Sequence, residues 1–196
     1  MSKRGLRVQE AAGYLLHCAA WRETSLVVQV FTRAHGNVAL VAKGAKRPYS
    51  VLRPVLSAFQ PLALSWSGSG EVKTLTRAEC AGIRALSGRA LMSAWYMNEL
   101  LLRLLPREDP HPALYDAYDG ALQRLATGSS AAGALRRFEW TLLHETGYGS
   151  DEAPPDFDDA SIEPALRLSL REKLNELLER PLQTRKVLMA LQRHVG

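Results

Sequence analysis

The chain has 196 residues, a composition typical of a soluble globular protein, and two cysteines, Cys18 and Cys80, without the CxxC spacing of a zinc site. Its length suits one large domain or two small ones, and no apolar run follows the charged start, which predicts neither a signal peptide nor a membrane span. The net charge of +5 is uneven: residues 1–90 hold 13 Lys and Arg against 4 Asp and Glu, and residues 91–196 hold 12 against 16. This asymmetry favours a basic module that binds an anionic partner, although it is also compatible with solubility alone.

The first half of the chain predicts β-strands. GYLLHCAAW, SLVVQVFT and the run that follows the turn at residues 34–37 are short apolar or β-branched segments separated by turn residues. Two more strand-like runs flank the turn at 67–70, and one helical or irregular segment is expected near 50–59. Five short strands with turns between them predict a small closed or partly open antiparallel barrel.

The second half predicts helices, because its apolar residues recur every three or four positions. The first expected helix ends at Pro106, the second has Pro112 in its first turn, and the third ends near Gly147 as a C-cap. Two further helices are expected over 162–179 and about 181–194.

The domain boundary is expected where AGIRALSG, residues 81–88, joins strands to helices. This gives a barrel domain over 1–82 and a helical domain over 83–196. The polar, acidic segment at 149–163 is predicted to be a loop or linker within the second domain.

The basic stretch VAKGAKRPYS, residues 41–50, does not fit a nucleotide-binding loop. Such a loop needs GxxxxGK[ST], whose glycines let backbone N–H groups surround the phosphates. Here Gly44 is followed by Ala, Lys and Arg. No GxSxG nucleophile elbow is present either, and we expect no enzymatic activity.

Metal-binding patterns are also missing from the sequence. His17 and Cys18 are neighbours on a predicted strand and therefore point to opposite faces. His144 and Glu145 lack the second histidine of HExxH, and the acidic run at 151–159 lacks the glycine and terminal glutamate of an EF-hand. We expect no metal and no other cofactor.

The basic residues of the first half fall mainly at the strand ends and loops of the predicted barrel, with aromatic residues between them. A barrel that holds nucleic acid uses cations along the phosphates and aromatic faces under the bases. We expect Phe31 and Trp66 to pack in the core, whereas Tyr49 is either a stacking platform or part of the loop packing. The predicted DNA-contacting residues are Lys43, Lys46, Arg47 and Arg53 as main contributors, with Arg22, Arg33, Lys73 and Arg77 along the path and Tyr49 beside them.

Several segments resemble a known family. RETSLVVQVFTRAHG, LVAKGAKR and GEVKTLTRAE, in this order and spacing, resemble the N-terminal domain of the RecO family of DNA repair proteins. YMNELLLRLLP and LRRFEWTLLHETGYG resemble the helical domain that follows in that family, and RPLQTRKVL resembles its closing segment. The resemblance covers most of the chain.

The resemblance implies an α+β chain with a five-stranded oligonucleotide/oligosaccharide-binding (OB) fold followed by an all-α domain. It further implies a cytoplasmic, nucleoid-associated recombination mediator that binds single- and double-stranded DNA, anneals complementary strands and assists RecA on DNA coated by single-strand-binding protein. The implied partners are RecR, the C-terminal tail of single-strand-binding protein and, indirectly, the RecA filament. Many members carry a four-cysteine zinc motif where this chain has the cysteine-free SDEAPPDFDDASIEP, so no zinc is expected.

Two questions stay open at the level of sequence. Arg136 and Arg137 are candidates for binding the acidic tail of single-strand-binding protein, but they could equally pair with Glu139 or Asp119 on the helix surface. A general RNA-binding module and a protein adaptor without annealing activity are the alternatives to the mediator function.

Overall fold

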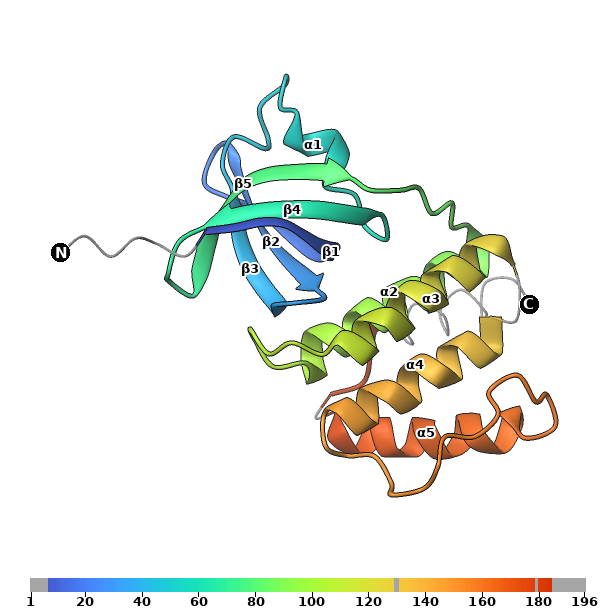
Figure 1. Ribbon diagram of the computed structural model, residues 1–196. Coiled ribbons are helices and arrows are strands. Elements are labelled where there is room, and N and C mark those ends of the chain that lie inside the picture. The colour runs from blue at the N-terminus through green and yellow to red at the C-terminus, as the bar shows by residue number, and fades with distance from the viewer. Residues whose placement is uncertain (1–6, 129–130, 179, 185–196) are drawn as a thin grey trace. The chain divides into compact units, whose positions relative to one another are not determined.

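Figure 1 shows the computed structural model, which describes residues 7–128, 131–178 and 180–184. The chain forms two compact units. The first, which we call the barrel unit, comprises the residues up to Arg84 together with 106–112, and the second, the helical unit, comprises 85–105 and the residues from Ala113 onward. The predicted fold class, a five-stranded barrel followed by helices, is confirmed.

The barrel unit is a closed sheet in the strand order β1-β2-β3-β5-β4. All neighbouring strands are antiparallel except β3 and β5, which pair in parallel from Ala39↔Val72 to Val41↔Thr74. This five-stranded arrangement is that of an OB fold. Its elements are β1 (Arg7–Trp21), β2 (Ser25–Thr32), β3 (Gly36–Ala42), α1 (Leu52–Val55), β4 (Pro61–Ser67) and β5 (Val72–Cys80).

Strand β1 is longer than the sequence predicted, because it begins at Arg7 rather than near Gly13. Its first half pairs with β4 and its second half pairs with β2, up to Trp21↔Ser25, so that one strand closes the barrel. A bulge near Glu10 separates the regular stretches, and the Glu10 N–H donates to Ser65 Oγ at 3.1 Å. Apolar patterning alone missed the first half because a bulge interrupts the alternation of side chains.

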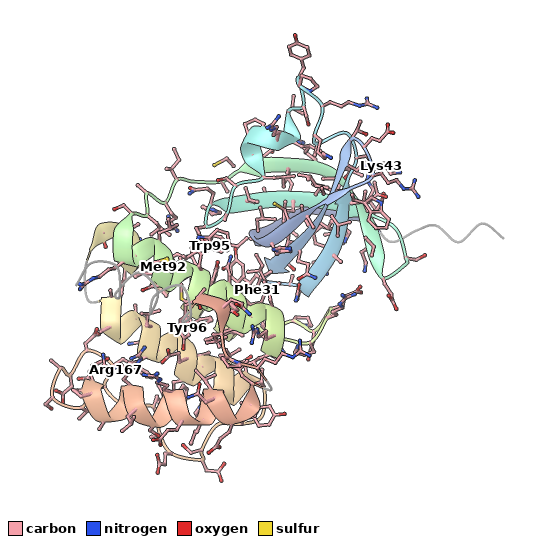
Figure 2. All side chains as sticks on the ribbon, turned by 180° about the vertical axis from the view of Figure 1, so that it is seen from behind. Phe31, Lys43, Met92, Trp95, Tyr96 and Arg167 are labelled. Carbon is pink, nitrogen blue, oxygen red and sulfur yellow. The ribbon has the colours of Figure 1, made fainter. Side chains whose placement is uncertain are left out.

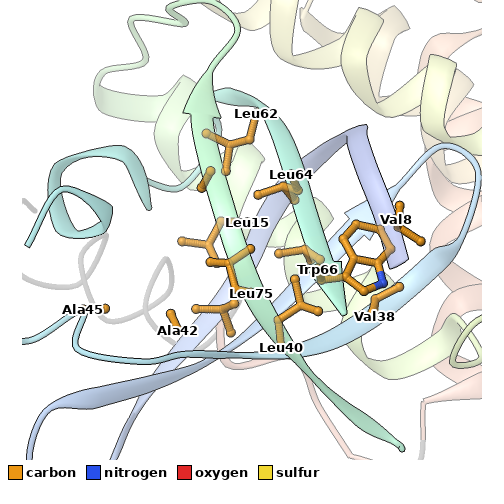
Figure 3. Packing of buried hydrophobic residues seen from close by; sticks show 13 residues of the cluster. Val8, Leu15, Val38, Leu40, Ala42, Ala45, Leu62, Leu64, Trp66 and Leu75 are labelled. Carbon is orange, nitrogen blue, oxygen red and sulfur yellow. The ribbon is translucent and has the colours of Figure 1, made fainter. Parts of the chain in front are cut away.

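The barrel core consists of aliphatic residues from all five strands, closed at one side by Trp66 (Figure 3). Val28 and Val30 are fully buried, as the alternation in SLVVQVFT predicts, and Leu40 on β3 is fully buried as well. Each such side chain contributes about 1.5–3 kcal/mol by leaving water. The core gives the loops at the strand ends a rigid support.

Within its described residues, the helical unit contains four long helices with apolar faces. The third of them ends as predicted at Gly147, whose φ is 82°. The Tyr148 N–H donates to Leu143 O at 2.7 Å and the Gly147 N–H to His144 O at 3.1 Å, which is the bonding of a Schellman cap. The helix predicted over about 181–194 lies outside the described residues from 185 onward. The four helices are α2 (Gly88–Leu104), α3 (Pro112–Thr127), α4 (Ala131–Glu145) and α5 (Glu163–Leu177).

Candidate nucleic-acid interface

Two loops meet at one end of the barrel. The Lys46 N–H donates to Thr24 O at 2.9 Å, and Lys46 Nζ lies 3.5 Å from Arg22 O, so the loop after β3 is joined to the turn between β1 and β2. The sequence separation of these residues is over twenty positions. The meeting of the loops brings cations from two segments onto one surface.

The loop after β3 is anchored by its smallest side chain. Ala45 is fully buried in the barrel core, whereas Lys43, Lys46 and Arg47 on either side of it are exposed. Gly44 has a φ of 71°, a backbone conformation that favours glycine, and its carbonyl accepts the Arg47 N–H at 3.0 Å. The loop therefore turns tightly and points its three cations to solvent; Figure 2 labels Lys43.

We call the exposed cations on these loops and on α1 the basic end. None of them forms an ion pair with a carboxylate among the residues that the structure describes. Because exposed cations without a paired acid keep their charge available, this surface attracts anions. The basic end consists of Arg22, Lys43, Lys46, Arg47 and Arg53.

Two aromatic side chains lie next to these cations in the chain and are exposed. Tyr49 is 98% exposed, which rules out the loop packing that the sequence left open for it. Trp21 is 48% exposed, and the Arg22 guanidinium lies 5.9 Å from its ring centroid. Phe31 and Trp66 are buried, as expected. Exposed aromatic faces beside cations fit the requirements of base stacking.

Arg33 lies apart from the basic end, whereas Lys73 and Arg77 differ from its cations because each pairs with a carboxylate. Arg33 follows β2, whereas Arg22 precedes it, and the eight residues of that strand span about 26 Å. Arg77 on β5 pairs with Glu79 at 2.7 Å, and both side chains are more than half exposed. Such surface pairs are weak, so Arg77 stays accessible.

Lys73 differs from what the sequence suggested. Its side chain is only 6% exposed and forms an ion pair with Glu108. A lysine that is buried and paired does not lie on an open path for DNA. Sequence reasoning missed this because Glu108 is 35 positions away.

In the helical unit, Arg136 is buried rather than available to a partner. Its Nη2 donates to Glu139 Oε1 at 3.0 Å and its Nη1 lies 3.1 Å from Glu163 Oε1. Tyr96 Oη also donates to Glu139, at 2.7 Å. The pairing of Arg136 with Glu139, which the sequence left open as an alternative to tail binding, is present, and it is buried rather than on the helix surface.

Arg137 is exposed and lies beside the acidic loop. Its guanidinium is 4.9 Å from the ring centroid of Phe157, a buried residue of that loop. Phe157 also contacts Trp140 edge to face, and Arg124 pairs with Asp158 at 2.7 Å. The acidic segment is thus a loop that packs on helices α3 and α4, rather than a solvated linker.

Within 7–128, 131–178 and 180–184, no cluster of three or more His, Cys, Asp or Glu side chains could hold a metal ion. Cys18 and Cys80 are both free and exposed. None of the helices in this part of the chain is long and apolar enough to cross a membrane.

Two family models match the chain in succession. Residues 6–84 match the model described as recombination protein O N terminal, and residues 86–153 match recombination protein O C terminal. The chain belongs to the RecO family. The RecO models end inside the acidic loop, so the part of the chain that follows Ala153 is matched by neither.

Curated relatives support this assignment. The chain is 59% identical over 143 residues to "DNA repair protein RecO" of Cupriavidus pinatubonensis, which covers 72% of this chain and 49% of that protein. It is 60% identical over 144 residues to the protein of the same name in Aromatoleum aromaticum, covering 73% and 60%. The match to the RecO protein of Ralstonia nicotianae is 55% over 145 residues, covering 74% and 53%. The chain thus spans about half to three fifths of the length of these relatives.

Proposed function

We propose that this chain is a DNA repair protein that binds the phosphate backbones of single- and double-stranded DNA through the basic end. The observation that carries the proposal is the gathering of exposed, unpaired cations and the exposed Tyr49 at one end of an OB barrel. The names of the curated relatives, all DNA repair proteins, support it.

The proposed activity is the annealing of complementary strands. Two DNA strands repel each other through their phosphates, and release of condensed counterions drives their binding to cationic surfaces. A protein that neutralises phosphates on both strands lowers the barrier to pairing as long as the base edges stay free. Phosphate contacts from Lys43, Lys46 and Arg47 carry no sequence preference, which suits annealing of any complementary pair.

We further propose a mediator role that needs partners but no catalysis. The chain would assist RecA in loading onto DNA coated by single-strand-binding protein, together with RecR and without zinc or another cofactor. We place this activity in the bacterial cytoplasm, on the nucleoid. In the helical unit, the exposed Arg137 offers a cation to the acidic tail of single-strand-binding protein.

A strand-annealing assay tests the proposal. Fluorescently labelled complementary strands, bare or coated with single-strand-binding protein, are mixed with the chain, and pairing is followed in time. We expect faster annealing of both substrates, and matched RNA strands in parallel show whether the activity is specific to DNA. If the chain neither binds oligonucleotides at low salt nor accelerates pairing, the proposed function is wrong.

A further inference from the structure

Lys73 is the most deeply buried cation of the barrel unit among the described residues. Its side chain is 6% exposed, and its Nζ donates to the Glu108 carboxylate and, at 3.3 Å, to Gly70 O. Lys73 follows the loop between β4 and β5, a loop that carries ligand contacts in OB barrels. Glu108, in contrast, is 47% exposed. The buried cation is therefore paired with a carboxylate that lies at the surface.

Glu108 belongs to a short segment, residues 106–112, that we call the strap. The strap lies between helices α2 and α3 in the sequence but is part of the barrel unit. The Glu108 N–H donates to Asn37 O at 3.0 Å, and Arg107 forms a β-bridge with Asn37. Five consecutive strap residues, 106–110, are exposed. The strap is therefore a surface segment that the start of β3 holds through backbone contacts.

The strap is also strained. Glu108 has a φ of 57°, in the left-handed region that is unfavourable for a residue with a side chain. Such a conformation costs about 1–3 kcal/mol and is often found at sites that change state. Opening of the strap would release this strain and offset part of the lost contacts.

Beneath the strap is a small pocket of about 100 Å³ with both polar and apolar lining residues. His35, Trp66, Lys73 and Glu108 contribute to its lining, and His35 contacts the Trp66 indole edge to face at 5.1 Å. A carboxylate and a phosphate are both acceptors for an ammonium group. Once the strap moves, the position that Glu108 fills at Lys73 suits a phosphate oxygen.

We propose that Lys73 is a latent site for a backbone phosphate of nucleic acid, and that Glu108 occupies it in the closed state. The strap then acts as an internal competitor: while it is closed Lys73 stays covered, and only when it opens does DNA that extends along the barrel from the basic end gain one more phosphate contact. This inference rests on the proposed DNA binding and adds a regulated site to it. A purely structural ion pair is the competing explanation, and the two differ in how binding responds to salt.

The test compares Glu108→Gln with Asp109→Asn. Both substitutions lie on the strap and raise the net charge by one, but Asp109 does not contact Lys73 among the described interactions. Binding to an oligonucleotide duplex is measured by fluorescence anisotropy between 50 and 300 mM salt, about the range in which phosphate contacts dominate. We expect Glu108→Gln to steepen the log–log salt slope by about 0.9 and to tighten binding about fivefold to tenfold near 0.1 M salt relative to Asp109→Asn.

The variant Lys73→Gln provides a second test, which remains valid even if Glu108→Gln does not fold. Lys73→Gln alone leaves the slope unchanged if Lys73 is covered, whereas a slope shallower by about 0.9 means that Lys73 already contacts phosphate and overturns the proposal. The double variant Lys73→Gln/Glu108→Gln should lose the steeper salt slope and the tighter binding that Glu108→Gln shows. Equal slopes for Glu108→Gln and Asp109→Asn also overturn it, while failure of the unmodified chain to bind any oligonucleotide overturns the proposed function instead.

Discussion

Arg136 and Glu139, one turn apart on α4, form an ion pair inside the helical unit, with side chains only 8% and 4% exposed. A buried pair of this kind is neutral or weakly favourable as a whole, but removing one partner leaves the other charge buried and uncompensated. The neighbouring Arg137 lies on the exposed side of the same helix. Two adjacent arginines in one motif therefore have different roles.

Replacement of Arg136 should destabilise the fold. We expect Arg136→Met to lower the free energy of unfolding by about 3 kcal/mol, because Glu139 and Glu163 lose their cation. Arg137→Met should cost about 1 kcal/mol or less, the value of an exposed cation–π contact. Urea unfolding followed by circular dichroism measures both. Equal losses of unfolding free energy in the two variants would contradict the different roles of Arg136 and Arg137. Binding of the tail peptide is tested separately with Arg137→Glu.

The loop after β3 should supply several phosphate contacts. We expect the triple replacement of Lys43, Lys46 and Arg47 by alanine to weaken binding to all sequences and to reduce the log–log salt slope by about 2 to 3 units. Fluorescence anisotropy at several salt concentrations provides the measurement.

The matched control for this triple variant removes three cations from α5. Arg167, Arg171 and Lys173 are the residues to replace by alanine, because the net charge changes equally while the basic end stays intact. A slope that falls by the same amount in both triple variants would show that overall charge, rather than the basic end, governs binding.

Tyr49 should contribute to binding of single strands by stacking. Base–aromatic stacking is worth about 1–3 kcal/mol, so Tyr49→Ala should weaken single-strand binding about fivefold to a hundredfold and duplex binding less. Because Tyr49 is 98% exposed, thermal stability should not change. Tyr148→Ala, at an exposed site of the helical unit, is the control. Unaltered single-strand affinity in Tyr49→Ala would refute a stacking role.

The Glu99 carboxylate should make stability depend on pH in the acid range. Burial by itself raises the pKa of Glu99. The opposing effects are hydrogen bonds from the backbone N–H groups of Thr184 and Gln183, a hydrogen bond from the Thr184 hydroxyl, and the positive charge of Arg103. Together they outweigh burial, so the pKa lies below its ordinary value of 4.5. A depressed carboxyl pKa gives stability that is present above the unfolded-state pKa and lost as pH falls through the folded-state pKa.

The lowered pKa of Glu99 predicts how replacing this carboxyl changes stability at different pH values. Glu99→Gln should be less stable than the unmodified chain by about 1–3 kcal/mol at pH 7, the usual value of hydrogen bonds to a charged group. The difference should shrink as pH falls below the unfolded-state pKa and through the folded-state pKa, below which the carboxyl is protonated in both folded and unfolded chains. Urea midpoints between pH 3 and pH 7 measure it, with the exposed Glu176→Gln as the control. A difference that is constant with pH would contradict the role of the charge.

Gly36 should tolerate alanine less well than Gly44, although both have a positive φ. A Cβ at Gly36 would lie 2.0 Å from the carbonyl oxygen of Asp109 on the strap, whereas the nearest atom at Gly44 is 3.5 Å away on the flexible Arg47 side chain. We expect about 1 kcal/mol of backbone strain for Gly44→Ala and about 3 kcal/mol for Gly36→Ala, which adds overpacking. Thermal unfolding ranks the two, and equal losses would mean that the strap yields freely.

Much of the fold could be predicted from the sequence because its signals are local. The β-branched alternation of SLVVQVFT, the turns near Gly36 and Gly70, and the three-to-four spacing of apolar residues after Gly88 each reflect a regular backbone period. The composition of the loop after β3 also placed its cations near a strand end. The first half of β1 was missed, since a bulge interrupts its pattern. The parallel pairing of β3 with β5 and the place of residues 106–112 in the barrel unit were missed as well, because both depend on contacts between distant segments.

What the tertiary structure decided is which charges are free. Lys43 and Lys73 look alike in the sequence, yet one is exposed and the other is covered by a glutamate 35 positions away. Arg136 and Arg137 are adjacent, yet only Arg136 pairs with acids inside the helical unit. The availability of a charge depends on burial and on partners distant in the chain, and sequence spacing does not encode those contacts. The sequence by itself determined the barrel, the helices and the presence of a basic surface, whereas the long-range contacts selected which cations remain open to an anionic partner.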